Sequence, residues 1–307
     1  MNDKSLPLLN DVCLPFQIEG QDIKGRVLRL GPSVHEILSK HNYPDHISKI
    51  LGQTLALTAL LGSLMKYDGI FTTQMKGEGL LRLMVADFSK DKDNDDASAK
   101  GVIRGYAGFD DGTNADDKLN ELFGDGSYLA ITIDQGKFME RYQGIVSLIG
   151  DNLTQAAEEY FQSSEQLPTK VMIECEKDED GRWQAGAIMI QHLARNTELE
   201  LTRDKDNTAD NWDIASILLS SLKSSELLDE NISLQQLLIR LYHEAGIRIF
   251  DHTEIAAGCR CSEEKIRTVL SSLDLEELKD VAEEGTVTVT CDFCTKNHKF
   301  ELTKLLH

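Results

Sequence analysis

The sequence predicts an α+β protein, built from a large, mainly antiparallel-sheet domain with packed helices, a helical middle segment and a small cysteine-rich C-terminal domain. Strand-like stretches joined by glycine-containing turns dominate the first part of the chain. Leucine-rich helical periodicity follows them, and four of the six cysteines lie near the C-terminus. The expected domains are 1–195 for the core, 196–250 for a helical linker segment and 251–307 for the cysteine-rich part.

Composition and charge exclude several classes of protein. The chain has 307 residues, of which 41% are hydrophobic, and 52 acidic against 32 basic residues give a net charge of −20. Such acidity argues against nucleic acid or a membrane surface as partner, because both attract basic patches. The stretch 1–9 lacks the apolar run of a signal peptide, so we expect a cytoplasmic protein. The apolar stretch 50–65 is too short for a membrane span and predicts a buried helix.

The first domain is expected to contain hairpins rather than alternating strands and helices. A helix begins at Pro44-Asp45 and ends near Lys66, and a second helix covers Asn152–Phe161. Turns at 76–79, 134–137 and 178–181 connect neighbouring strands, which predicts antiparallel pairing. The expected strands are Phe71–Met75, Leu80–Val85, Val102–Gly108, Tyr128–Ile133, Phe138–Leu148, Thr169–Glu176 and Arg182–Ile190. The stretch Ser89–Ser98, dense in Asp and Lys, is expected to be a solvated loop.

The composition changes near Leu193, and from Asp210 the pattern is helical. One helix is expected to bury a stripe of Ile214, Ile217, Leu218 and Leu222. In a second, Ser233 and Gln236 form a capping box and Gly246 ends the helix. Its apolar positions are Leu234, Leu237, Leu238, Leu241 and Tyr242. These stripes either pack permanently on the first domain or form an interface that is covered in only one state.

Four cysteines form two close pairs, Cys259 with Cys261 and Cys291 with Cys294, about 30 residues apart. Zinc accepts four thiolates tetrahedrally, and each pair can supply two of them from one short segment, so the spacing predicts one zinc site. Ser262 is expected to cap a helix with Ile266, Val269, Leu270 and Leu273 on one face, followed by a second helix at Asp274–Ala282. A break at Gly285 and strands at Thr286–Thr290 and Lys299–Leu302 place Cys291–Cys294 in a hairpin turn.

Other roles for these cysteines are weaker. A thioredoxin-type pair should open a helix after a strand, and catalytic zinc keeps one position open, with His or carboxylate ligands. We therefore expect His298 to be a surface residue, and Cys13 and Cys175 to be ordinary semi-buried residues. Two hypotheses stay open for the zinc: a purely structural site, which is the commoner kind, or a switch in which oxidation of the thiolates releases the metal.

Several motifs along the chain are similar to one family. They are Arg104-Gly105-Tyr106-Ala107, the stretch 160–169, Leu241-Tyr242-His243-Glu244, Cys261-Ser262-Glu263-Glu264 and Cys291-Asp292-Phe293-Cys294. Together with the cysteine spacing, they make the chain resemble the redox-regulated, thirty-three-kilodalton heat-shock chaperones of bacteria. The resemblance covers the whole chain and is specific, whereas a C-x-x-C motif alone would not be.

The resemblance implies an ATP-independent holdase that binds unfolding proteins under oxidative stress, and not an enzyme. It implies that Cys259, Cys261, Cys291 and Cys294 hold one zinc ion per chain in the reduced, inactive form. It further implies that oxidation pairs Cys259 with Cys261 and Cys291 with Cys294, releases the zinc and unfolds the C-terminal domain and linker. The resemblance also implies that clients then bind and that the oxidised form is a homodimer. The alternatives are a constitutive zinc-binding adaptor and, less favoured, a thiol-disulfide oxidoreductase.

Overall fold

The computed structural model describes residues 10–65, 69–90, 101–136, 139–192 and 205–305. The chain divides into two compact units, Met1–Ala257 and Gly258–His307. The strands are β1 (Val12–Ile18), β2 (Ile23–Leu30), β3 (Ile70–Lys76), β4 (Leu81–Lys90), β5 (Gly101–Phe109), β6 (Tyr128–Asp134), β7 (Tyr142–Ser147), β8 (Thr169–Lys177), β9 (Trp183–His192), β10 (Ile247–Ile249), β11 (Thr253–Ala257), β12 (Ala282–Glu283), β13 (Thr286–Thr290) and β14 (Asn297–Glu301).

The helices of the first unit are α1 to α7, with one π-helical turn after α4. They are α1 (Pro32–Ser39), α2 (Asp45–Gly62), α3 (Leu119–Phe123), α4 (Leu153–Tyr160), η1 (Phe161–Glu165), α5 (Lys205–Ser220), α6 (Ser224–Leu227) and α7 (Leu234–Tyr242). The second unit contains α8 (Glu263–Leu270), α9 (Leu275–Asp280) and α10 (Leu302–Leu305). Over the residues that the structure describes, no helix combines the length and apolarity that a membrane span needs.

One large sheet organises the first unit. Its strand order is β7-β6-β3-β4-β5-β11-β1-β2-β9-β8, and β10 pairs additionally with β1. Among the described strands of this sheet, the pairings are antiparallel except between β11 and β5, which run parallel. The short strand β11 joins two groups of strands, because it contacts β5 on one side and β1 on the other. The predicted mixed α+β fold with a mainly antiparallel sheet is confirmed.

Helix α2 forms the centre of the larger core. It is apolar over most of its circumference, and it contacts strands β2, β3, β4, β5, β8 and β9. Helices buried on nearly all sides show this kind of composition in soluble proteins. The prediction of a buried helix over 50–65 is therefore confirmed, although the helix ends at Gly62, short of Lys66.

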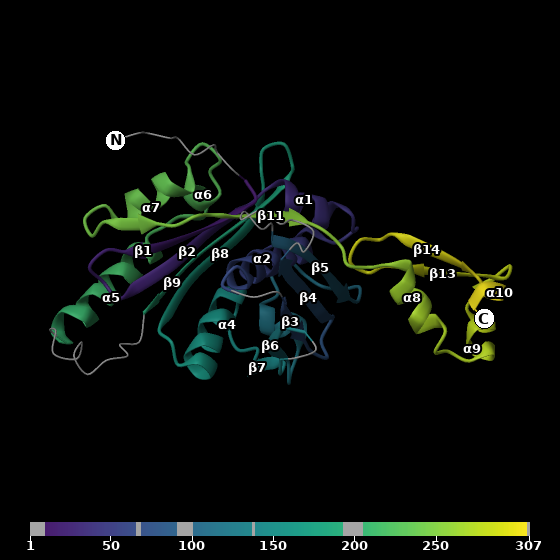
Figure 1. The fold of residues 1–307 in the computed structure, drawn as a ribbon. Coiled ribbons are helices and arrows are strands. Elements are labelled where there is room, and N and C mark those ends of the chain that lie inside the picture. The colour runs from purple at the N-terminus through teal and green to yellow at the C-terminus, as the bar shows by residue number, and fades with distance from the viewer. Residues whose placement is uncertain (1–9, 66–68, 91–100, 137–138, 193–204, 306–307) are drawn as a thin grey trace. The chain divides into compact units, whose positions relative to one another are not determined.

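A second core lies on the other face of strands β1, β2 and β9, where helices α5 to α7 pack (Figure 1). Successive residues of a strand point to opposite faces, so β2 contributes Leu28 to the first core and Val27 to the second. The leucines predicted on α7 are all buried in this second core. The Ser233–Gln236 capping box is as predicted. The helix ends at Tyr242, earlier than the predicted stop at Gly246, which has a positive φ of 77°.

The prediction for the stripe of α5 is wrong at its first two positions. Ile214 and Ile217 are 54% and 68% exposed, whereas Ala215 and Leu219 are buried. The face of α5 that contains Ala215 and Leu219 is therefore the one that packs in the second core. Leu222 is buried as predicted, two residues beyond the end of the helix.

The predicted hairpins are confirmed, with small changes at their ends. Strand β3 pairs with β4, β6 with β7, and β8 with β9. The first hairpin, β1–β2, and the short strands β10 and β11 were not predicted. Of the predicted loop Ser89–Ser98, Ser89 and Lys90 belong to β4 and the rest lies outside the described residues, as do 1–9, Lys66, Phe138 and the composition change at Leu193.

Candidate metal centre

The second unit is a small framework around a core of its own. Strands β12, β13 and β14 form an antiparallel sheet, and helices α8 and α9 contribute to the core. The buried residues of this core are Leu270, Leu278, Val287, Phe300 and Leu305. The predicted apolar face of α8 is wrong in part, because Val269 and Leu273 are exposed. Only the narrow line of Ile266 and Leu270 turns inward, since a short helix packed on one side buries about one residue per turn.

The pair Cys291 and Cys294 occupies the turn between β13 and β14, as predicted. The Cys291 amide donates to the Lys296 carbonyl at 3.0 Å, and the Thr295 amide donates to the Cys291 carbonyl at 2.8 Å. Thr295 has a positive φ of 57°, which closes the turn tightly. The amides of Phe293 and Cys294 donate to the Cys291 sulfur. This turn points two thiols to one side and surrounds one of them with N–H donors.

The pair Cys259 and Cys261 lies in the extended segment that leads into α8. Ser262 caps this helix, because its Oγ accepts from the Lys265 amide at 3.2 Å. The Lys265 ammonium in turn donates to the Arg260 carbonyl at 3.2 Å. The cap and this contact fix the backbone between the two cysteines, so the segment presents both sulfurs at the start of the helix.

The four sulfur atoms converge. All lie within 4.8 Å of one another, with 3.7 Å between Cys259 and Cys291 and 3.6 Å between Cys261 and Cys294. A tetrahedral site with metal–sulfur bonds of about 2.3 Å holds its sulfurs about 3.8 Å apart. A disulfide would bring two sulfurs to about 2.05 Å, and all four cysteines are free. The donor set and its spacing fit one tetrahedral metal ion.

Crowding opposes simultaneous ionisation of these thiols. Burial, helped by the neighbouring Cys259 and Cys294, raises the pKa of Cys261 to about 12, and burial also raises the pKa of Cys291. Burial disfavours the Cys259 thiolate too, but hydrogen bonds from the Cys261 amide and from neighbouring thiols lower its pKa to about 7. One thiolate therefore forms readily and repels the next. A bound divalent cation would allow all four to ionise together.

The remaining cysteines and His298 lie outside the cluster. Cys13 and Cys175 were predicted to be semi-buried, and both are fully buried in the first unit, where burial raises the pKa of each thiol. The prediction that His298 is a surface residue is wrong: it is 3% exposed. His298 and Phe300 lie two residues apart on β14, and both side chains are on the buried face of the strand. Neither ring nitrogen of His298 has a hydrogen-bond partner among the described residues.

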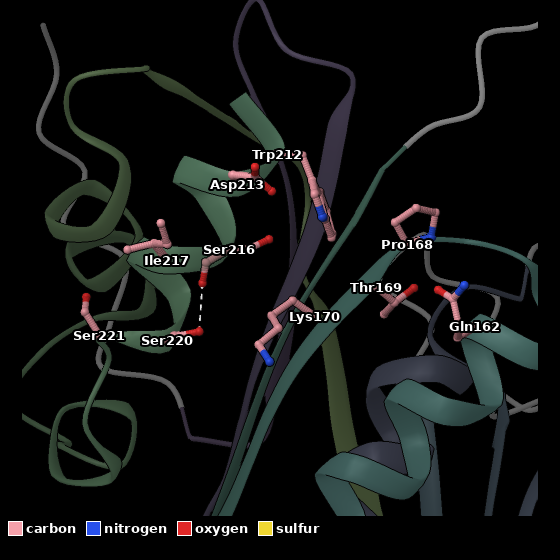
Figure 2. A pocket seen from close by; sticks show the side chains of 10 residues that line it. All are labelled: Gln162, Pro168, Thr169, Lys170, Trp212, Asp213, Ser216, Ile217, Ser220 and Ser221. Atoms are coloured by element: carbon pink, nitrogen blue, oxygen red, sulfur yellow. Dashed lines mark hydrogen bonds between the residues drawn. The ribbon is translucent and has the colours of Figure 1, made fainter. Parts of the chain in front are cut away.

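A separate concavity in the first unit lies between α5 and β8 (Figure 2). Its volume is about 770 Å³, and Trp212 and Ser216 line it from α5 opposite Lys170 on β8. The Lys170 ammonium contacts the Glu158 carboxylate at 3.1 Å, so its charge is already paired. The lining contains serines but no histidine beside them to act as a base. The cysteine cluster is therefore the stronger candidate site.

Fold and site together define a class: an α+β protein whose helices α5 to α7 cover one sheet face and whose C-terminal unit gathers four thiols at metal-binding distance. A model of the family described as Hsp33 protein matches residues 11–301. The chain belongs to this family, which confirms the resemblance inferred from its motifs.

Relatives agree over nearly the full length. The 33 kDa chaperonin of Caulobacter vibrioides (strain NA1000 / CB15N) is 35% identical over 307 residues, covering 96% of each chain. That of Shewanella frigidimarina is 32% identical over 295 residues, 95% of this chain and 93% of the relative. The crystal structure of the 33 kDa chaperonin from Thermotoga maritima matches with a TM-score of 0.76 at 21% identity, over 96% of this chain and 97% of that one. That likeness supports the fold.

Proposed function

We propose that this protein is a redox-regulated, ATP-independent holdase of the cytoplasm that binds unfolding proteins during oxidative stress and is not an enzyme. The observation that carries the proposal is the convergence of four free thiols at tetrahedral spacing, in a chain of a chaperone family. Membership of the family supports chaperone activity, and the cluster supports its regulation by thiol chemistry.

In the reduced state, we propose that Cys259, Cys261, Cys291 and Cys294 bind one zinc ion. Four thiolates in a closed set are typical of structural zinc. The core of the second unit contains few buried side chains, so the unit depends on the metal for much of its stability. Structural zinc contributes on the order of 10–16 kcal/mol of folding free energy to such small units. Loss of the metal should therefore unfold this unit.

Oxidation removes the metal ligands. A peroxide accepts two electrons from Cys259 and Cys261, whose sulfurs form one S–S bond, and two protons complete two water molecules. A second peroxide does the same at Cys291 and Cys294. A disulfide sulfur is a poor zinc ligand, so the ion leaves. The Cys259 sulfur also lies close to that of Cys291, and the Cys261 sulfur close to that of Cys294. Disulfides between the two segments are therefore sterically possible as well, and the experiment must determine which disulfides form.

Release of the middle segment would then expose the client-binding surface. Strand β11 ends at Ala257, directly before Gly258 and Cys259. Unfolding of the C-terminal unit would therefore leave the end of β11 without a folded continuation of the chain. Helices α5 to α7 cover apolar side chains of β1, β2 and β9. Their departure would uncover an apolar surface for unfolded clients, or for a second copy in an oxidised homodimer. We propose 196–250 as the linker that moves.

The proposal is tested by treating the reduced, zinc-loaded protein with peroxide at elevated temperature. We expect release of about one zinc ion per chain together with two disulfides, mapped by mass spectrometry to the pairs Cys259–Cys261 and Cys291–Cys294. Zinc that stays bound would contradict the switch and favour a constitutive zinc adaptor. Catalytic turnover of a small disulfide substrate would instead favour a thiol-disulfide oxidoreductase.

A further inference from the structure

A buried arginine faces the middle segment. Arg29 lies on β2 and is 3% exposed. Arg29 lies two residues after Val27 on the same strand, so both side chains point to the same face of the sheet. Val27 belongs to the second core, and this is the face that α5 to α7 cover. Arginine keeps its charge in proteins, and burying a charge is costly unless hydrogen bonds replace its water.

The hydrogen bonds of Arg29 go to backbone carbonyls of the middle segment. Its Nε and Nη2 donate to the Leu227 carbonyl at 3.0 and 2.8 Å, and its Nη1 donates to the Ile232 carbonyl at 2.8 Å. Leu227 is the last residue of α6, where carbonyls lack partners within the helix. One guanidinium thus holds both ends of the loop 227–232, which leads from α6 toward α7.

A carboxylate within the same loop makes a second set of contacts. Glu230 Oε1 accepts from Gln184 Nε2 at 2.6 Å and from Asn10 Nδ2 at 2.7 Å. Burial lowers the pKa of Arg29, and the carboxylates of Asp229 and Glu230 oppose that shift, so the loop carries the charge that complements the guanidinium.

The sheet leaves room for this loop. Gly186 stands opposite Arg29 in the β2–β9 register. A Cβ there would lie 2.9 Å from Leu227 Cγ and 3.1 Å from Leu228 Cδ2. Glycine at this position therefore lets the end of α6 approach the sheet closely enough for Arg29 to reach the loop.

We infer that Arg29 is a positioning residue, which latches the loop 227–232 to the sheet and so sets how readily the middle segment is released. This inference deepens the proposed function, on which its regulatory meaning rests. Apolar contacts of α5 and α7 can loosen one at a time, whereas the loop leaves only when the three bonds of Arg29 break together. Once the segment has left, the guanidinium and both carbonyls return to water. The latch therefore disfavours partly lifted states more than the fully released one.

Hydrogen–deuterium exchange of the reduced, metal-loaded full-length protein tests the latch. Arg29→Met keeps most of the side-chain length and removes every donor, which leaves two carbonyls without partners. We expect amides of 227–242 to exchange at least about 10-fold faster than in the unchanged protein. Arg29→Lys, which has a single ammonium, should lie in between. Arg248→Met on β10 is the matched control, because Arg248 is exposed, and it should leave exchange unchanged.

Two results would overturn the latch: unchanged exchange over 227–242, or an equal increase over strands β3 to β6, which would make Arg29 a general core residue. If Arg29→Met does not fold, Glu230→Gln serves instead, with faster exchange expected over the same stretch and unchanged exchange overturning the inference. Aggregation suppression by the unchanged protein after peroxide treatment is measured in parallel. Its absence would contradict the proposed function and leave the latch standing.

Discussion

Individual hydrogen bonds to sulfur prepare the C-terminal unit for a metal ion. Backbone amides of Phe293 and Cys294 donate to Cys291, and the Cys261 amide donates to Cys259. Such donors stabilise a thiolate locally, before the other half of the site is in place. Each cysteine pair is thus shaped by its own short segment, and the folding of the unit brings the two pairs together.

Loss of one sulfur should therefore abolish tight metal binding. For Cys291→Ser, we expect zinc affinity to fall by well over 100-fold, because even groups that only support metal ligands change affinity about 10–100-fold. The variant should also lose the thermal transition of residues 258–307, followed by circular dichroism with metal titration. Cys13→Ser is the control, since Ser63 Oγ lies 3.2 Å from the Cys13 sulfur and can bond a hydroxyl as well. A Cys291→Ser protein that binds zinc as tightly as before would contradict the proposed four-thiolate site.

Some functional or buried residues could be predicted from the sequence, and others could not. The ligand cysteines could be found because their spacing is local and their chemistry unusual. His298 and Arg29 could not, because the burial of a polar side chain depends on which face of a strand packs against the rest of the molecule. The available signal was a spacing of two residues on a strand, which places His298 on the same face as Phe300 and Arg29 on the same face as Val27. Both residues occupy inward positions that apolar residues usually fill.

At the scale of elements, α7 is the clearest example of a helix defined by its sequence. The capping box at Ser233 starts it, and Gly246 closes the turn that follows it. Leu237 and Leu238 are at most 1% exposed, whereas the next residue, Ile239, is 52% exposed. One side of this helix therefore holds it on the sheet, and the other side contributes little to docking.

This asymmetry gives a matched pair of variants. Leu238→Ala should weaken docking of α7 by about 2–5 kcal/mol, the usual cost of truncating a buried leucine. It should raise client binding by the reduced protein, measured as suppression of aggregation without oxidant. Ile239→Ala removes a similar side chain from the exposed side and should leave both stability and activity unchanged. Equal behaviour of the two variants would show that α7 does not act as a cover.

Elements formed by local contacts were predictable, and those formed by distant contacts were not. The hairpins β3–β4 and β8–β9 carry their turn residues in sequence. The parallel pairing of β11 with β5 joins segments about 150 residues apart, and no local pattern encodes it. For α5, periodicity predicted a stripe that contains Ile217, whereas packing against the sheet buries Ala215 and Leu219 instead.

At the scale of the whole molecule, the net charge of −20 takes on a physical role within the proposed mechanism. Net charge far from zero keeps proteins apart through mutual repulsion. A chain that must uncover an apolar sheet face can then remain in solution while it holds a client. One unit contains the covered sheet face and the other contains the four thiols. In the proposed mechanism, client binding and redox sensing therefore fall to different units.

The central claim is that thiol oxidation switches on client binding, and light scattering of a heat-unfolded test enzyme measures this most directly. The reduced, zinc-loaded protein should not prevent aggregation. The same protein after peroxide treatment at elevated temperature should prevent it, and a thiol reductant with zinc should reverse the change. Equal suppression before and after oxidation, or none in either state, would contradict the account.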